Sequence, residues 1–228
     1  KYDVPYQVIG NGSNLLVGDR GIRGLVIEML SKEDEICVED DCITVGAGML
    51  LSKTANRAAD HGLTGMEFAA GIPGSIGGAV VMNAGAYGGE MKDILTAVTV
   101  LDQEGNEKIL SAEELELGYR TSCILKKGYI VTGAKIKLKH GEETAIRARM
   151  EELKKQRVEK QPLEYPSAGS TFKRPEGYFA GKLIMDAGLR GYLVGEAQVS
   201  EKHCGFVINR GNATAADVRT LMQNVADI

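Results

Sequence analysis

The chain of 228 residues has no tryptophan, only four phenylalanines and three histidines, and its net charge is −4. Because proteins that bind nucleic acid usually carry a basic surface, the acidic balance argues against a general nucleic-acid binder. The longest apolar runs, such as residues 78–82, are far too short to span a bilayer. We also see no signal peptide at the start. We therefore expect a cytoplasmic protein with neither a nucleic-acid nor a membrane partner.

The sequence also lacks the cysteine and histidine spacing of a metal site. Its four cysteines are Cys37, Cys42, Cys123 and Cys204, and no pair has CxxC spacing. His203 directly precedes Cys204, which is a poor spacing for two ligands of one metal. We expect reduced, partly buried thiols and no metal.

Proline is scarce, at five residues, whereas glycine is abundant, at 29. A hydrophobic content of 43% with 25% charged residues is ordinary for a globular protein, so the glycines do not signal disorder. They concentrate in loops, which indicates backbone that approaches a ligand closely. The length allows one large domain or two modest ones.

The pattern of apolar residues predicts a mixed α+β fold in two lobes. Short β-branched runs bounded by turn residues predict strands at residues 4–9, 15–17, 24–27, 36–38, 43–45, 97–101, 107–110, 129–138 and 204–208. EDDC between the strands at 36–38 and 43–45, and DQEGN between those at 97–101 and 107–110, predict two hairpins. Helical spacing predicts helices at residues 52–61, 142–160, 181–187 and 214–225. Gly62 is expected to stop the first of these, and Thr214 to cap the last. The charged helix at 142–160 is expected to join the lobes.

Two glycine-rich segments are candidates for binding an anion. GNGSN, at residues 10–14, can direct several backbone N–H groups at a pyrophosphate, but a plain turn explains it about equally well. GIPGSIGGAVVMNAGAYGG, at residues 71–89, places seven glycines in 19 residues, which favours a ligand over a buried turn. Neither segment is a Rossmann fingerprint or a Walker A loop.

Arginine and serine side chains supply the remaining candidates. Arg120, in GYRTS, can hold a carboxylate or phosphate, although an ordinary surface salt bridge is the simpler interpretation of that motif alone. Ser170, in PSAGSTFKRP, can form a turn, act as a nucleophile or donate a proton. A nucleophile would need a histidine and an acid, and no GxSxG elbow is present. Lys173 and Arg174 are close enough in sequence to stabilise its conjugate base.

The ordered set of motifs resembles one family over essentially the whole chain. GNGSN, GIPGSIGGAVVMNAGAYG, YRTS, PSAGSTFKRP, AGKLIMDAGLRG and HCGFVINRGNATAADV resemble the UDP-N-acetylenolpyruvoylglucosamine reductases, the MurB family, in their shorter second type. The resemblance implies an FAD-binding domain of the vanillyl-alcohol-oxidase (PCMH) type followed by an α+β substrate-binding lobe. It implies FAD, NADPH as the hydride source, and an enolpyruvyl ether of UDP-N-acetylglucosamine as the substrate, reduced to UDP-N-acetylmuramate in peptidoglycan synthesis.

The resemblance also assigns roles to residues. Ser170 matches the serine that protonates the substrate carbon, and Arg120 the arginine that stabilises the intermediate. Tyr87, Lys173 and Arg174 are assigned to the substrate, and Arg174 stands where part of the family has asparagine. The residues assigned to FAD are Gly10, Asn11, Gly12, Ser13, Asn14, Gly71, Gly74, Ser75, Gly77, Gly78, Asn83 and Gly85.

The same resemblance predicts where the chain divides. We expect residues 1–139 to be the FAD-binding domain, 140–160 a connecting helix and 161–228 the substrate lobe. The family has a small subdomain before the GNGSN strand and a catalytic glutamate after the last helix. We therefore expect the chain to be truncated at both ends and to bind FAD poorly in this length. We also expect a monomer.

Two other functions remain open from the sequence. One is another FAD-dependent oxidoreductase of the same fold, although no motif for covalent flavin attachment is visible. The other is a non-catalytic binder of nucleotide sugars. A yellow protein bleached by NADPH would favour the reductase over the binder.

Overall fold

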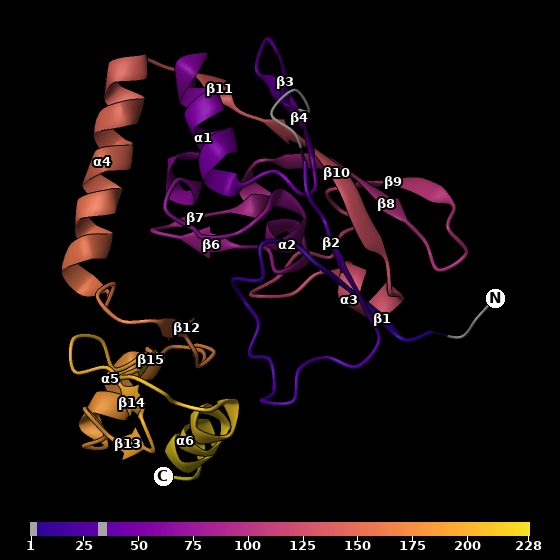
Figure 1. The fold of residues 1–228 in the computed structure, drawn as a ribbon. Helices are drawn as coiled ribbons and strands as arrows, with labels where there is room; N and C mark the ends of the chain where they lie inside the picture. Colours follow the sequence, from indigo (N-terminus) through magenta and orange to yellow (C-terminus); the bar gives the residue numbers. More distant parts are fainter. Residues whose placement is uncertain (1–3, 32–35) are drawn as a thin grey trace. The chain divides into compact units, whose positions relative to one another are not determined.

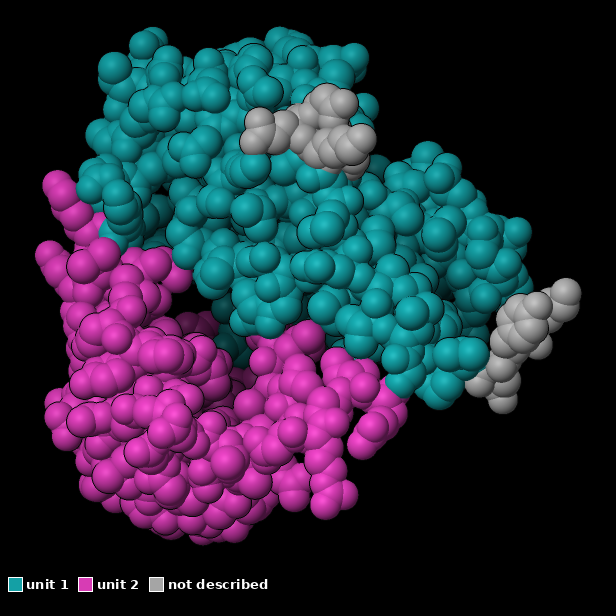
Figure 2. All heavy atoms as spheres, viewed as in Figure 1, with its two compact units in different colours: residues 1–13, 24–154 teal, residues 14–23, 155–228 magenta. Residues whose placement is uncertain are grey.

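The structure is a computed structural model that describes residues 4–31 and 36–228 (Figure 1). The chain forms two compact units (Figure 2). The first comprises the described residues up to Ser13 and within Gly24–Lys154, and the second comprises Asn14–Arg23 and Lys155–Ile228. Each unit has its own core of buried apolar side chains.

The first unit is built around a five-stranded antiparallel sheet, in the order β3-β4-β10-β8-β9. Its strands are β3 (Ile36–Glu39), β4 (Cys42–Gly46), β8 (Leu95–Leu101), β9 (Glu107–Ser111) and β10 (Ile130–Lys137). Two sequence-local hairpins, β3–β4 and β8–β9, flank the long strand β10. Both predicted hairpins are therefore confirmed.

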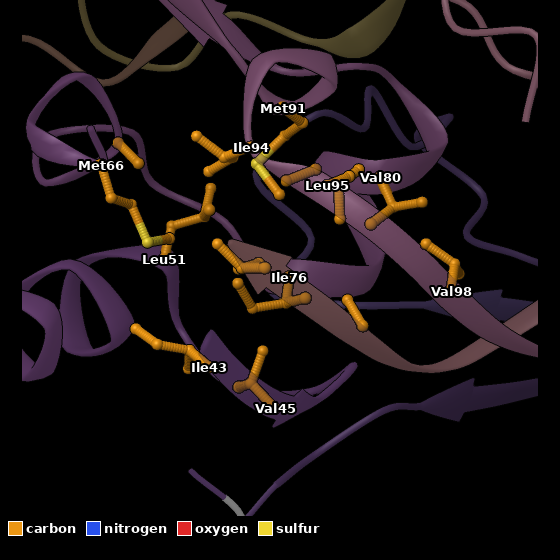
Figure 3. Close-up of a cluster of buried hydrophobic side chains, with 14 of the residues drawn as sticks. Ile43, Val45, Leu51, Met66, Ile76, Val80, Met91, Ile94, Leu95 and Val98 are labelled. Carbon is orange, nitrogen blue, oxygen red and sulfur yellow. The ribbon is translucent and has the colours of Figure 1, made fainter. Parts of the chain in front are cut away.

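Two helices bury apolar faces in this unit, α1 (Leu51–Asp60) and α2 (Ile76–Val81). Figure 3 shows part of the core, where Ile43 and Val45 of β4 lie near Ile76 of α2. The helix predicted at residues 52–61 is confirmed as α1, whose buried face includes Ala55, Ala58 and Ala59. Gly62 follows α1 with φ +63°, the left-handed conformation of a helix stop.

Short elements complete the first unit and shape its loops. They are β5 (Leu63–Thr64), η2 (Glu67–Ala69), β6 (Gly85–Ala86), β7 (Gly89–Glu90), η3 (Met91–Asp93), α3 (Cys123–Lys127) and β11 (Lys139–His140). A separate parallel pair joins β1 (Tyr6–Ile9) to β2 (Leu25–Glu28). Both of these strands match the prediction.

The predicted strand at residues 15–17 is wrong. In the described structure residues 15–17 belong to no strand or helix. Its segment, Asn14–Arg23, belongs instead to the second unit. There the Asp19 carboxylate accepts hydrogen bonds from the backbone N–H of Ala215 at 2.7 Å and Ala216 at 3.2 Å. The segment thus contacts a helix that is distant in sequence, which no local pattern reveals.

The second unit has a four-stranded antiparallel sheet, in the order β12-β15-β14-β13. Its strands are β12 (Ser167–Ser170), β13 (Leu193–Val194), β14 (Ala197–Val199) and β15 (Phe206–Asn209). Two helices, α5 (Ala180–Asp186) and α6 (Ala215–Asp227), carry buried side chains of this unit's core. The Thr214 hydroxyl accepts from the Asp217 N–H at 3.0 Å, which confirms the predicted cap.

The charged helix α4 (Glu143–Lys160) begins in the first unit and ends in the second. Ile146 and Leu153 are buried along it, and most of its other side chains are exposed. The helix predicted at residues 142–160 is thus present with nearly the expected bounds.

The four cysteines are free thiols, and Cys123 and Cys204 are buried. Within residues 4–31 and 36–228, no group of three or more His, Cys, Asp or Glu side chains is placed to hold a metal ion. In that same part of the chain no helix is long and apolar enough to cross a membrane.

Candidate active site

The glycine-rich segment folds into a turn, the short helix α2 and a second turn. Ser75 precedes the helix in an extended conformation, and the helix begins at Ile76. The N–H of Ile76 donates to the Met49 carbonyl at 2.8 Å, and the N–H of Gly77 to the Ala47 carbonyl at 2.7 Å. A Cβ at Gly77 would lie 3.0 Å from the Ala47 Cβ, so this glycine permits the close approach.

The GNGSN loop lies directly beside the start of α2. The Ser13 hydroxyl donates to the Pro73 carbonyl. A Cβ built on Gly10 would fall 2.0 Å from the Ser75 Oγ, so any side chain there would have to displace the Ser75 hydroxyl or the loop. The two segments that the sequence pattern singled out are therefore brought together. The outer residues of the loop, Asn11 and Asn14, are exposed.

Ser75 presents a buried donor that the protein does not use. Its side chain is 2% exposed, and among the described residues its Oγ has no hydrogen-bond partner. Leaving a buried hydroxyl unpaired costs on the order of 1–3 kcal/mol, so such a group usually has a purpose. Nearby, Gly12 has φ +65°, and nothing lies within 4 Å of the Cβ it lacks. The arrangement suits an anionic group such as the pyrophosphate of a dinucleotide, held by backbone and hydroxyl.

Arg120 sits in a tight turn of the same unit. The backbone groups of Gly118 and Thr121 bond to each other at 3.1 and 3.3 Å across the turn, and Arg120 has φ +55°. Its guanidinium donates to the carbonyls of Asn83 at 3.4 Å and Gly85 at 2.9 Å. In the described part of the chain its hydrogen-bond partners are thus carbonyl oxygens rather than a carboxylate, and it also lies 5.2 Å from the Tyr119 ring centroid. A surface salt bridge does not explain this arginine, and its remaining N–H groups can bind an anion.

Asn83 is the centre of the hydrogen bonds around that turn. It is completely buried and has φ +40°. Its amide nitrogen donates to Glu90 Oε2 at 2.8 Å and to the Gly118 carbonyl at 3.0 Å. Its amide oxygen accepts from the Lys92 N–H at 2.9 Å. Both amide hydrogens are therefore bound within the protein.

Tyr87 occupies the turn of the β6–β7 hairpin. Tyr87 has φ +52° and the following Gly88 has φ +88°, as a type I′ turn requires. The tyrosine is half-buried. With Asn83 and Arg120, it is one of five non-glycine residues of the described ranges that have positive φ. Backbone of this kind clusters at functional sites, because the surrounding structure has to hold it.

Ser170 lies in the second unit, at the end of β12. The segment, for which no strand was predicted, is a strand with an irregular register, in which Ser170 pairs with Phe206. The preceding Gly169 has φ +74°. Ser170 is exposed. The strand escaped sequence analysis because its residues, SAGS, have little strand propensity.

The structure gives no support to Ser170 as a hydrolase nucleophile. His203 is the only histidine of the same unit, and its Nδ1 accepts from the Gly205 N–H at 3.1 Å. Its ring meets Phe206 edge-on at 4.9 Å. In the described part of the chain no hydrogen bond joins His203 to Ser170. Two exposed cations follow the serine, Lys173 and Arg174, and the latter stacks 5.6 Å from the Phe179 ring centroid.

Several supporting residues were missed by sequence analysis. The Ser122 hydroxyl donates to the Val81 carbonyl at 2.8 Å, which ties the Arg120 turn to the end of α2. The Glu90 carboxylate lies 2.6 Å from the Lys92 ammonium, and this contact raises the pKa of Lys92. The YRTS motif contains Ser122 but did not indicate this contact. No local signal marked Glu90 or Lys92.

Comparisons with known proteins agree with this geometry. The family model described as "FAD binding domain" matches residues 1–111. The model described as "UDP-N-acetylenolpyruvoylglucosamine reductase, C-terminal domain" matches residues 161–228. The orphaned Ser75 hydroxyl and the Gly10 contact lie within the first match, so the residues present fit the phosphates of FAD.

Curated relatives and a solved structure cover nearly the whole chain. The UDP-N-acetylenolpyruvoylglucosamine reductase of Agathobacter rectalis is 60% identical, over 99% of this chain and 76% of its own. The reductase of Lachnoclostridium phytofermentans is 58% identical, over 100% and 75%. The crystal structure of the Thermus caldophilus enzyme is 42% identical with a TM-score of 0.87, over 99% of this chain and 82% of that chain.

The expected α+β fold, an FAD-binding domain followed by a C-terminal substrate lobe, is confirmed by these matches. The chain belongs to the UDP-N-acetylenolpyruvoylglucosamine reductase family of FAD-dependent oxidoreductases.

Proposed function

We propose that this protein uses NADPH to reduce the enolpyruvyl ether of UDP-N-acetylglucosamine to UDP-N-acetylmuramate, for peptidoglycan synthesis. The observation that supports it best is the orphaned Ser75 hydroxyl facing Gly10, in the same unit as a guanidinium held by backbone carbonyls. An anionic cofactor and an anionic substrate both have a matching donor. The protein is expected to work as a monomer in the cytoplasm.

The proposed cofactor cradle consists of the two glycine segments. In this proposal the backbone of residues 10–14 and the start of α2 bind the phosphates of FAD, and Ser75 donates its free hydroxyl. FAD, when bound, supplies the hydride that the substrate receives. The residues proposed for this cradle are Gly10, Asn11, Gly12, Ser13, Asn14, Gly71, Gly74, Ser75, Gly77, Gly78 and Gly85.

The proposed chemistry adds a hydride and a proton across the enolpyruvyl double bond. The methylene carbon gains the hydride, and electron density moves toward the carbon that bears the carboxylate. Arg120 stabilises this developing charge through the N–H groups it does not donate to carbonyls. Ser170 delivers the proton to that carbon, which gives the lactyl ether, and NADPH becomes NADP⁺.

The remaining proposed contacts belong to substrate binding. Tyr87 and the cations Lys173 and Arg174 hold the nucleotide sugar. Lys173 and Arg174 also lower the cost of the serine alkoxide that forms when Ser170 gives up its proton. We also propose that residues 1–139 form the FAD-binding domain, 140–160 the connecting helix and 161–228 the substrate lobe.

Turnover by the full-length protein, reconstituted with FAD, tests this proposal. NADPH oxidation is expected to require the enolpyruvyl UDP-sugar, and the product is expected to be heavier by two hydrogens in mass spectrometry. NADPH oxidation that depends on oxygen alone would indicate another flavoprotein of this fold. A protein that binds the UDP-sugar without consuming NADPH would indicate a binder. Either result would contradict the proposal.

A further inference from the structure

Asn83 contacts Arg120 from two directions. Its backbone carbonyl accepts from the guanidinium at 3.4 Å, and its amide nitrogen donates to the Gly118 carbonyl at 3.0 Å, two residues before Arg120. One residue therefore binds both the side chain of Arg120 and the start of the turn that carries it. The neighbouring Gly85 carbonyl accepts the second guanidinium bond, at 2.9 Å.

Asn83 is itself held from the opposite side. Glu90 Oε2 accepts its amide at 2.8 Å, and the Lys92 N–H donates to its amide oxygen at 2.9 Å. A carboxylate can only accept and a backbone N–H can only donate, so these two partners allow a single orientation of the amide. The Lys92 ammonium, 2.6 Å from Glu90 Oε1, keeps that carboxylate in place. The Asn83 side chain is thus fixed before any ligand arrives.

The backbone of Asn83 limits which residues can stand there. Its φ of +40° lies in the left-handed region, which glycine, asparagine and aspartate adopt most readily. Glycine has no side chain to reach Gly118, and aspartate has no N–H to donate. Asparagine alone combines the conformation with two donors. Both donors are used within the protein, which leaves the Asn83 amide no N–H for a ligand.

We propose that Asn83 is a positioning residue for Arg120. Its amide aligns the Gly118–Thr121 turn and its carbonyl aims the guanidinium, so that the free N–H groups of Arg120 meet the developing charge on the substrate. The catalytic part of this inference rests on the proposed function, whereas the positioning of the Arg120 guanidinium by Asn83 does not. Misplacing a reacting group by about 1 Å can cost on the order of 10²-fold in rate.

Asn83→Asp tests the inference with little change of shape. The variant keeps the size and the tolerance for positive φ, but it removes both donors and places a charge beside Glu90. Asn56→Asp is the matched control, since Asn56 is exposed on α1 and, among the described residues, its amide bonds only to the Ser52 carbonyl, at 2.7 Å. Asn83→Gly is a second variant that suits the backbone and adds no charge.

The first readout is the nitrogen NMR spectrum of the Arg120 guanidinium, identified by its loss in Arg120→Lys. Carbonyl bonds slow rotation of the guanidinium nitrogens, so wild type and Asn56→Asp are expected to show separate Nη signals. Both Asn83 variants are expected to merge these signals while circular dichroism stays native. Unchanged Arg120 signals in the folded variants would overturn the inference, whether or not the protein is a reductase.

The second readout separates positioning from a general structural role. Asn83→Asp is expected to slow substrate reduction on the order of 10²-fold, while bleaching of the flavin by NADPH stays within about threefold. In an Arg120→Lys background the same change is expected to cost less than about threefold more. Equal loss in both half-reactions, or full additivity with Arg120→Lys, would overturn the inference. If wild type itself does not reduce the substrate, the proposed function fails and the NMR result alone decides.

Discussion

Gly10 and Ser75 approach each other so closely that a Cβ on Gly10 would fall 2.0 Å from the Ser75 Oγ. This contact joins two glycine-rich segments that are distant in sequence, and it places backbone beside an unpaired buried hydroxyl. It is the structural basis for the proposed cofactor cradle. It also makes the cradle testable by the smallest possible substitutions.

Gly10→Ala is expected to weaken FAD binding by at least about tenfold, because the new methyl group has to displace the Ser75 hydroxyl or the loop. Flavin fluorescence on titration of the apoprotein measures this. Gly18→Ala is the matched control, since nothing lies within 4 Å of the Cβ that Gly18 lacks. Equal affinity of the Gly10 and Gly18 variants would argue against the cradle.

Ser75→Ala is expected to change stability and FAD binding in opposite directions. The apoprotein loses an unpaired buried hydroxyl, so its free energy of unfolding is expected to stay level or rise by up to about 1 kcal/mol. The loss of a donor to the cofactor is expected to weaken FAD binding about 5–10-fold. Urea unfolding and flavin titration give the two values. A destabilised apoprotein with unchanged FAD affinity would show that the hydroxyl serves the fold.

The lowered pKa of Asp102 predicts how the free energy of unfolding depends on pH. It is buried at the β8–β9 turn, where the Lys108 ammonium at 2.8 Å and the Asn106 N–H at 2.8 Å hold the pKa of its carboxyl well below the usual range. Because the folded pKa is lowered, the stabilisation is complete above the unfolded pKa of about 3.9 and is lost as the pH falls toward the folded value.

Comparison of wild type with Asp102→Asn measures that contribution. The difference in unfolding free energy is expected to be constant from about pH 5 to 8 and to shrink as the pH falls below about 4. Urea unfolding across this range provides the data. A difference that stays constant to about pH 2 would mean that the carboxylate is not the source.

Local turns made part of the fold predictable. The EDDC and DQEGN sequences lie between short β-branched runs, and both hairpins formed where expected, as β3–β4 and β8–β9. Helix α2 was not predicted, because its two glycines disfavour a helix by about 1 kcal/mol each. Hydrogen bonds from Ile76 and Gly77 to the β4–α1 connection override that propensity. No strand forms at residues 15–17, and the same segment contacts a distant helix through Asp19.

The candidate site divides in the same way. Gly10, Ser75 and Arg120 stood in recognisable motifs, so the pattern identified them before their contacts were known. Glu90 stood in no such motif, because its role is to accept a hydrogen bond from the amide of Asn83. Sequence motifs can identify candidate ligand-binding groups, whereas the residues that hold them depend on contacts between distant segments.

The central claim is that Ser170 protonates a substrate reduced by this enzyme, and rapid-mixing kinetics of Ser170→Ala in the full-length protein test it most directly. Bleaching of the flavin by NADPH is expected to stay within about threefold of wild type. Recovery of the flavin absorbance on mixing with the enolpyruvyl UDP-sugar is expected to slow by about 10²–10⁴-fold, the usual contribution of a positioned proton donor. Recovery at the wild-type rate, or equal loss of both steps, would contradict the account.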